Sequence, residues 1–202
     1  MRAGLLFVLL ACAVAAAHAE QFTGKVVVII DGDTVIVTRK GGPPVKVRLA
    51  GIDAPEVGHA GMGGKPPNSQ KDQPGGMASK ASLSELALRK QVSVNIQATD
   101  SYGRLVAYLA ADGKSINEEQ IRRGMAWEYS GFHGNKAYVE LQSEAQQARR
   151  GLWAGDEIVE PAQWRKLHPF TSPAATGPSA AHPGKPQRDP ACHKRYCSEM
   201  IS

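Results

Sequence analysis

The sequence predicts an α+β fold that is mainly β: a five-stranded Greek-key barrel of the OB type with about three helices. Five short runs of β-branched and apolar residues are joined, with one exception, by turns of hairpin length, which favours an antiparallel sheet. About five such strands can remove their exposed edges by curling into a small barrel. Three further segments carry apolar residues at helical spacing. An open α+β sandwich is the alternative architecture.

The five strands are expected at residues 25–30, 34–38, 45–49, 91–97 and 104–110. Between the first two, the Asp-Gly pair at 31–32 is typical of a tight hairpin turn, and GGPP at 41–44 marks the next turn. In VKVRL at 45–49 apolar and basic residues alternate. We therefore expect Arg48 to point away from the barrel interior.

Helices are expected at about 78–90, from a capping box of Ser115 and Glu118 to a terminating Gly124, and at about 135–150. Two of them have clear apolar stripes with the spacing of a buried helix face. These stripes are Leu83, Leu86 and Ala87 in the first helix, and Tyr138, Leu141, Ala145 and Ala148 in the last, with Gly151 as its C-terminal cap.

Residues 1–19 are expected to be an export signal, because Arg2 precedes a short apolar run that ends in the small-x-small pattern of Ala17 and Ala19. The alternative interpretation is a lipoprotein signal with Cys12 as the lipid acceptor. We therefore expect a periplasmic or secreted protein without membrane insertion. A folded domain is expected over residues 20–166, followed by a Pro/Ala/Gly-rich linker or disordered tail over residues 167–202.

The charge balance is mildly basic. Removal of residues 1–19, which contain one Arg and no acid, lowers the formal net charge from +5 to +4. Such a charge suits a polyanionic partner without identifying one. The two cysteines beyond residue 19 are both near the C-terminus, so the core is not expected to be held by disulfides.

Acidic side chains interrupt the strands at two places. In IIDGDTVIV (29–37) the turn explains Asp31, but Asp33 lies where the strand resumes, and an ionised carboxylate is costly there unless a cation or donor meets it. In GIDAPE (51–56) Asp53 and Glu56 follow the third strand. If the second and third strands pair, Asp33 and Asp53 lie near the same end of the hairpin. Together with the carbonyl of Ala54 they form an oxygen-rich pocket that suits a hard cation such as Ca²⁺.

Two arginines complete this group. Arg48 lies on the outer face of the third strand, and Arg104 opens the fifth strand after the turn DSYG. Two guanidinium groups near a bound cation can clamp a phosphate, because each offers planar, paired donors. Taken alone, Arg48 indicates nothing beyond an outward-facing strand residue, and a solvated strand end is the favoured explanation for Arg104.

Taken in order, DGDTV, RLAGIDAPE, DSYGR and GLW after a C-terminal helix resemble the staphylococcal nuclease family over residues 22–153. The resemblance implies an OB-type barrel with three helices and Ca²⁺-dependent hydrolysis of DNA and RNA phosphodiesters. Asp33 and Asp53 would ligate the metal by their side chains and Ala54 by its carbonyl, where the family often has Thr. Asp31 would orient water or the ligands.

The resemblance also assigns the catalytic residues. Glu56 would position or deprotonate the attacking water. Arg48 and Arg104 would neutralise charge that develops on the phosphorus, with Arg104 assisting the leaving 5′ oxygen, so that 3′-phosphate ends result. Tyr102 would contact the substrate phosphate or sugar, with ordinary turn packing as the alternative.

The expected partners are DNA and RNA, preferably single-stranded or locally unpaired, bound by a monomer without sequence specificity. An aromatic platform for unpaired bases is expected from MAWEYSGFH, which contains Trp127, Tyr129 and Phe132. Burial of Trp127 in the core is the favoured alternative for that residue. The long loop at 57–77 either flanks the substrate groove, with His59 near the site, or is a simple insertion.

The C-terminal CHKRYCSEM is similar to a short Cys-containing motif of some exported nuclease relatives, and we expect a local Cys192–Cys197 disulfide. A metal site that includes His193 is the alternative. For the whole chain, there are two alternative functions: a nucleic-acid-binding OB module without catalysis, and a secreted Ca²⁺-binding adhesion or structural module. The first predicts loss of at least one of Asp33, Arg48, Glu56 or Arg104, all of which are present, and the second leaves both arginines unexplained.

Overall fold

The computed structural model describes residues 20–58, 72–130, 134–156 and 158–169. All of these belong to one compact unit, residues 1–172. Several sequence predictions lie outside the described residues: the export signal, Cys12, His59, Phe132 and the Cys192–Cys197 disulfide. No helix within the described ranges has the length and apolar character needed to cross a membrane.

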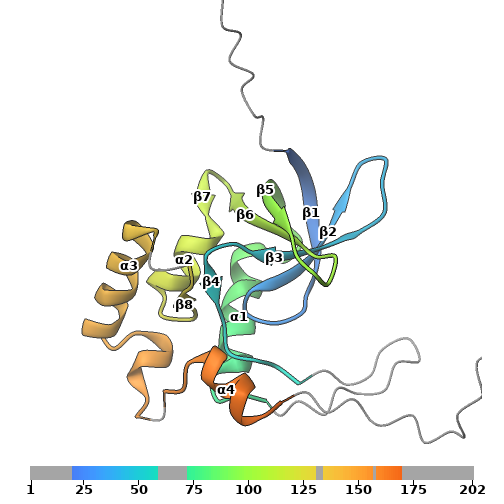
Figure 1. The fold of residues 1–202 in the computed structure, drawn as a ribbon. Helices are drawn as coiled ribbons and strands as arrows, with labels where there is room; N and C mark the ends of the chain where they lie inside the picture. Colours follow the sequence, from blue (N-terminus) through green and yellow to red (C-terminus); the bar gives the residue numbers. More distant parts are fainter. Residues whose placement is uncertain (1–19, 59–71, 131–133, 157, 170–202) are drawn as a thin grey trace, which may run out of the picture. The chain divides into compact units, whose positions relative to one another are not determined.

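Strands and helices follow one another in a mixed order that begins with four strands and ends with helices (Figure 1). The elements are β1 (Gln21–Ile29), β2 (Thr34–Arg39), β3 (Val45–Leu49), β4 (Ile52–Asp53), α1 (Gly76–Ala87), β5 (Gln91–Thr99), β6 (Leu105–Ala111), β7 (Lys114–Ser115), α2 (Ile116–Arg122), β8 (Trp127–Glu128), α3 (Lys136–Gln147), the 3₁₀ helix η1 (Gly151–Ala154) and α4 (Pro161–Leu167).

Five strands close into a barrel, as predicted. The strand order is β3-β2-β1-β5-β6, and β3 also pairs with β6. This closing pair is parallel, with Val47 opposite Leu105, so the expectation of an entirely antiparallel sheet was wrong. The other barrel pairs are antiparallel, and register shifts at Val26/Val28 and Ile96/Ala98 interrupt β1 and β5. Such irregularities bend strands and help a sheet to curl.

The alternating side chains of the strands fill the barrel. In β3, Val47 and Leu49 are fully buried while Arg48 faces outward, as the alternation predicted. The barrel interior and the helix faces against it form one apolar core, to which α1 contributes Leu83 and Ala87. The remaining fully buried members are Val26, Val35, Val37, Ile52, Val92, Val94, Ala107, Leu109, Ile121 and Ala126.

The helices differ from the prediction mainly at their ends. The first covers Gly76–Ala87, not 78–90, because the chain turns through a left-handed Arg89. Ser115 caps α2 by accepting a hydrogen bond from the Glu118 N–H, as predicted. The third ends at Gln147, so Ala148 is exposed, and Gly151 begins η1 instead of capping the helix.

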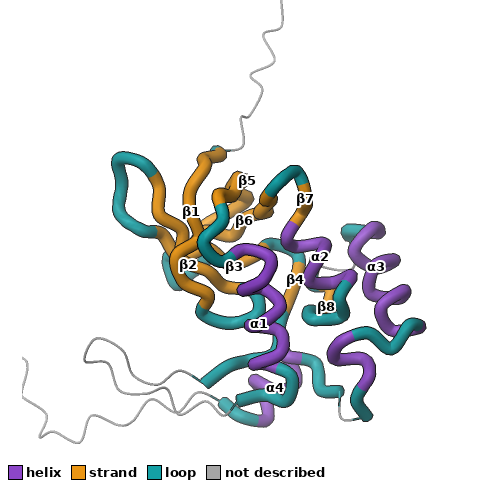
Figure 2. The backbone as a smooth tube through the Cα atoms, turned by 180° about the vertical axis from the view of Figure 1, so that it is seen from behind, coloured by secondary structure: helices purple, strands orange, loops and turns teal. Residues whose placement is uncertain are grey.

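The last helix, α4, is an addition that the sequence analysis did not predict. It covers Pro161–Leu167, with Pro at the first helical position, where its missing N–H costs nothing. Figures 1 and 2 show α4 at the end of the described chain, near the start of α1. The described fold therefore has four α-helices, and its C-terminal element returns toward the loop that follows β4.

Candidate active site

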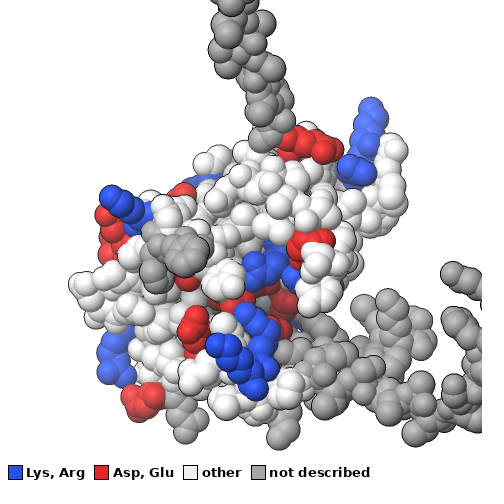
Figure 3. All heavy atoms as spheres, in the orientation of Figure 1, with Lys and Arg blue, Asp and Glu red and all other residues white. Residues whose placement is uncertain are grey.

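A cavity of about 340 Å³ opens where several loops and strand ends meet α4. We call it the carboxylate cavity, since four carboxyl groups and three guanidinium groups line it. Figure 3 shows acidic and basic side chains gathered around a hollow on this face. Its lining residues are Asp31, Asp33, Arg48, Asp53, Ala54, Glu56, Tyr102, Arg104, Tyr129 and Arg165. The lining includes all the residues to which the resemblance assigns metal binding, catalysis or contact with the substrate phosphate, but not Trp127 of the expected aromatic platform.

The turn between β1 and β2 supplies Asp31 and Asp33. The Asp33 carboxylate is buried and accepts hydrogen bonds from the Thr34 hydroxyl at 2.8 Å and the Ala54 N–H at 3.2 Å. Asp31 accepts one from the Asp33 N–H at 3.0 Å. These donors provide the partners that an ionised carboxylate at this position requires.

Gly32 between the two acids is required for space. The Asp-Gly pair predicted a tight hairpin turn, in which glycine is usually favoured for a positive φ, but Gly32 is not among the glycines with positive φ. A Cβ there would lie 1.9 Å from the Ser79 hydroxyl of α1 and 2.7 Å from the Ala54 Cβ. The turn therefore packs directly against α1 and the Asp53–Ala54 segment, which brings the two groups of acids together.

The β4–β8 pair and a buried glutamine position Asp53 and Glu56. Asp53 lies opposite Trp127 in this short ladder and is 2% exposed. The Glu56 N–H donates to the Gln73 side-chain oxygen at 3.2 Å, and the Glu56 carbonyl accepts from the Gln73 N–H at 2.9 Å. The Gln73 amide also donates to the Val159 carbonyl at 2.6 Å. Gln73 thus ties the Glu56 loop to the segment that precedes α4.

Arg48 reaches into the cavity from β3. One guanidinium nitrogen, Nη2, lies 3.3 Å from Asp33 Oδ2 and 3.0 Å from Asp53 Oδ1. Its Cζ also lies 5.9 Å from the centre of the Tyr129 ring. A single cationic group therefore joins two carboxylates that are twenty residues apart in the sequence.

The turn at 100–104 presents Arg104. The Asp100 carboxylate accepts hydrogen bonds from the N–H groups of Tyr102 and Arg104, both at 2.9 Å, and from Arg104 Nε at 2.6 Å. The Arg104 Cζ lies 5.5 Å from the centre of the Tyr102 ring, and Tyr102 is 84% exposed. Tyr102 therefore stands at the rim of the cavity and is not packed into the turn.

Arg165 of α4 is the functional-site residue that sequence reasoning missed. Its guanidinium forms a two-pronged contact with Asp53, 2.7 Å from Oδ2 and 3.1 Å from Oδ1, and also lies 2.7 Å from Glu56 Oε1. The sequence analysis ended the domain at residue 166 without a helix there. Pro161 followed by Arg165 and Lys166 is a usable signal for a short helix, though not for where it docks.

Burial and mutual repulsion shift the acids of the cavity. Burial, with repulsion from Asp33, raises the pKa of Asp31 to about 8. Burial also raises the pKa of Asp53 and Glu56, although hydrogen bonds from Arg165 oppose this. Burial lowers the pKa of Arg48, but attraction to Asp33 and Asp53 outweighs it and the net shift is upward. A cation bound between these carboxylates would favour their ionised forms and so oppose the upward shifts of their pKa values.

The donors present fit a hard cation such as Ca²⁺. Among the described residues there is no group of three or more His, Cys, Asp or Glu side chains that could hold a metal ion. The predicted ligand set needs only two, and oxygens of Asp33 and Asp53 already converge on one positively charged nitrogen of Arg48. Oxygen donors of this kind, completed by a backbone carbonyl and water, are those that Ca²⁺ prefers.

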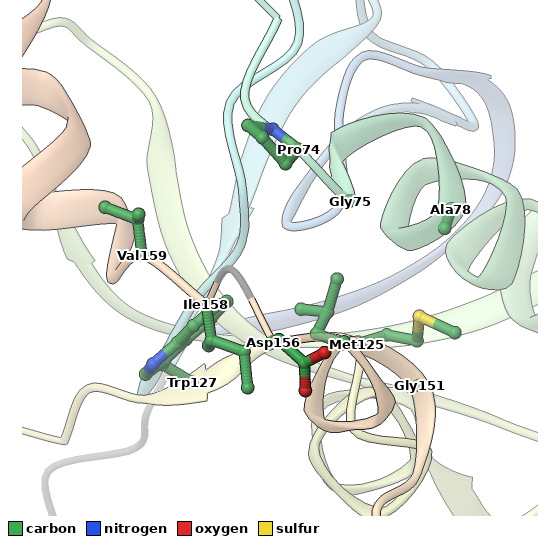
Figure 4. A pocket seen from close by; sticks show the side chains of 11 residues that line it. Pro74, Gly75, Ala78, Met125, Trp127, Gly151, Asp156, Ile158 and Val159 are labelled. Carbon is green, nitrogen blue, oxygen red and sulfur yellow. The ribbon is translucent and has the colours of Figure 1, made fainter.

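A larger, mainly apolar cavity of about 540 Å³ lies apart from this chemistry (Figure 4). We call it the apolar cavity. Its walls include Met125 and Trp127, the start of α1 and the segment before α4 that contains Ile158 and Val159. Trp127 lines this cavity and contacts Trp153, with ring centres 4.9 Å apart, so it does not extend the carboxylate cavity. Of the expected aromatic platform, Tyr129 lines the carboxylate cavity and is 53% exposed.

Comparison with known proteins agrees with this geometry. A model of the family described as staphylococcal nuclease homologues matches residues 46–155. An uncharacterized endonuclease of Haemophilus influenzae is 38% identical over 147 residues, which cover 73% of this chain and 75% of that protein. A micrococcal nuclease of Shigella flexneri is 33% identical over 160 residues, which cover 72% of this chain and 82% of that protein. The α4 helix lies beyond the residues that the family model matches.

Proposed function

The chain belongs to the staphylococcal nuclease family, and from this premise we propose that it is an exported, Ca²⁺-dependent nuclease. It would hydrolyse phosphodiester bonds of DNA and RNA without sequence specificity and leave 3′-phosphate ends. The observation that supports this most directly is the carboxylate cavity, in which four carboxyl and three guanidinium groups face one another. A cation and a phosphate are the natural ligands of such a mixed site.

The acids of the cavity would have two tasks. The side chains of Asp33 and Asp53 and the carbonyl of Ala54 would hold Ca²⁺, which supplies Lewis-acid polarisation of a phosphoryl oxygen. Asp31 accepts a hydrogen bond from the Asp33 N–H and would orient water or the metal ligands. Glu56 accepts a proton from the attacking water or orients it.

The arginines would act on the phosphate. As the bond from the water oxygen to phosphorus forms and the bond to the 5′ oxygen breaks, Arg48 and Arg104 donate hydrogen bonds to the oxygens that gain charge. The leaving 5′ oxygen takes up a proton from solvent, which gives a 5′-hydroxyl and a 3′-phosphate. The long side chain of Arg104 is oriented by Asp100 at 2.6 Å, which limits the freedom lost when phosphate binds.

Substrate selection would come from phosphate contacts and exposed rings. Tyr102 and Tyr129 are both exposed at the rim of the carboxylate cavity, where an unpaired base can stack on either ring. Because only an unpaired base can stack on these rings, we propose a preference for single-stranded or locally unpaired DNA and RNA. Because stacking tolerates any base, we propose no sequence specificity. We also propose that the active form is a monomer.

The test is to incubate the purified chain with labelled single-stranded DNA and RNA, in Ca²⁺ and in chelator, beside Glu56→Gln. We expect Ca²⁺-dependent fragments with 3′-phosphate ends. The turnover rate of the variant should be lower by a factor on the order of 10²–10⁴. Binding of the oligonucleotides without cleavage under every metal tried would instead favour a nucleic-acid-binding module that has lost catalysis.

A further inference from the structure

Arg165 occupies the oxygens that the proposed cation site needs. Both carboxylate oxygens of Asp53 accept hydrogen bonds from its guanidinium, at 2.7 and 3.1 Å. The same guanidinium binds Glu56 Oε1 at 2.7 Å. One positive side chain therefore neutralises a proposed metal ligand and the proposed base at the same time.

Asp53 Oδ1 is shared by two arginines, because Arg48 Nη2 lies 3.0 Å from it and Arg165 Nη1 lies 3.1 Å from it. A divalent cation bound to the same carboxylate would add a third positive group within a few ångströms. Like charges this close repel strongly in a partly buried site. One of the two guanidinium groups therefore has to move when a cation binds.

Arg165 is better placed to move than Arg48. Arg48 projects from β3, a barrel strand paired on both sides, and its side chain is 17% exposed. Arg165 has a side-chain exposure of 38% and projects from α4. With seven residues, α4 is too short to be stable without tertiary contacts.

The docking of α4 is incomplete in two respects. The indole N–H of Trp164 is buried and has no hydrogen-bond partner among the described residues. The segment that leads into α4 borders the apolar cavity at Ile158 and Val159, as Figure 4 shows. The Gln73–Val159 hydrogen bond at 2.6 Å anchors the chain just before the helix, so residues beyond Val159 can shift about a fixed point.

We propose that Arg165 is a further positioning residue of the active site, which holds Asp53 and Glu56 in the metal-free chain and competes with the cation for them. This inference rests on the proposed function, since it takes Asp53 as a metal ligand. Loading of the metal displaces the guanidinium of Arg165 from Asp53. The same displacement releases Glu56, so that the base becomes available only when the metal site is filled.

The test measures Ca²⁺ binding directly, by calorimetric titration of the metal-stripped full chain without substrate. Arg165→Gln removes the competing charge, and we expect it to bind Ca²⁺ roughly tenfold more tightly than the wild type. Lys166→Gln is the matched control, because Lys166 is exposed and next to Arg165 on α4. We expect this control to change the affinity by about twofold at most, since exposed charges are screened.

Two further measurements keep the proposal falsifiable if Arg165→Gln is poorly folded. Arg165→Lys keeps the charge but loses the two-pronged contact. We expect its Ca²⁺ affinity to lie between those of the wild type and Arg165→Gln. In the wild type, amide hydrogen exchange in α4 should become faster when Ca²⁺ is added. Unchanged or weaker Ca²⁺ binding in both Arg165 variants, or unchanged exchange in α4, would overturn the inference.

Asp53→Asn separates this inference from the proposed function. If the wild type binds Ca²⁺, Asp53→Asn loses that binding and Arg165→Gln is no tighter, then only the competition is refuted. If the wild type binds no Ca²⁺, or if Asp53→Asn leaves binding intact, then the proposed metal site is refuted and the inference with it.

Discussion

Gln120 of α2 links the turn between β1 and β2 to Ser79 and Ser82 of α1. Its replacement by Leu should destabilise the fold strongly. Gln120 is 0% exposed. Its amide nitrogen donates to the Gly32 carbonyl at 2.8 Å and the Ser79 carbonyl at 3.3 Å, while its oxygen accepts from the Ser82 hydroxyl at 2.7 Å. Leu has a similar volume but satisfies none of these groups.

The magnitude follows from the two short hydrogen bonds. Each buried partner left unpaired costs about 1–3 kcal/mol, so Gln120→Leu should lower the free energy of unfolding by about 2–6 kcal/mol. Gln120→Ala should cost still more, because it leaves a cavity as well as the unpaired groups. A loss of this size is a large fraction of the stability of an ordinary domain.

The assay is urea unfolding followed by tryptophan fluorescence, with chelator present so that cation binding adds no stability. Gln97→Leu is the matched control, because the Gln97 amide is exposed and bonds only to Asn95 among the contacts described here. We expect this control to lie within about 0.5 kcal/mol of the wild type. A Gln120→Leu variant within about 1 kcal/mol of the wild type would refute the assignment of Gln120 as a buried link.

Two further predictions concern the turns that hold the site. Gly32→Ala should lower the free energy of unfolding by about 1–3 kcal/mol, because its Cβ would lie 1.9 Å from the Ser79 hydroxyl; a urea midpoint equal to that of the wild type would contradict this. Slight burial acts to raise the pKa of Asp100, but hydrogen bonds from Arg104 outweigh it and hold that pKa below its usual range. The ionised carboxylate therefore stabilises the fold above the unfolded pKa of about 3.9, and this contribution is lost as pH falls through the lower folded value. An NMR titration of Asp100 that gives a pKa of 3.9 or higher would show the reasoning to be wrong.

The barrel was predictable because its signals are local. The alternation within VKVRL places Val47 and Leu49 on one face of the strand and Arg48 on the other, and this pattern depends only on adjacent residues. The Ser115 cap depends on an atom only three residues away. The closure of the barrel by a parallel β3–β6 pair was missed, since it joins strands that are far apart in the sequence and no local pattern encodes their direction.

For the candidate site, the types and order of the residues reveal which chemistry is present, whereas the fold sets which groups meet. Asp33, Asp53 and Glu56 could be predicted as site residues from the sequence, because their carboxylates interrupt or follow apolar strands. The role of Arg165 could not be predicted from the sequence, because Arg165 lies 112 residues after Asp53 and resembles any basic residue at the end of a helix. Its contact depends on α4 folding back onto the β4 loop, and the partners of a long, flexible side chain are set by what surrounds its tip in space, not by its neighbours in the chain.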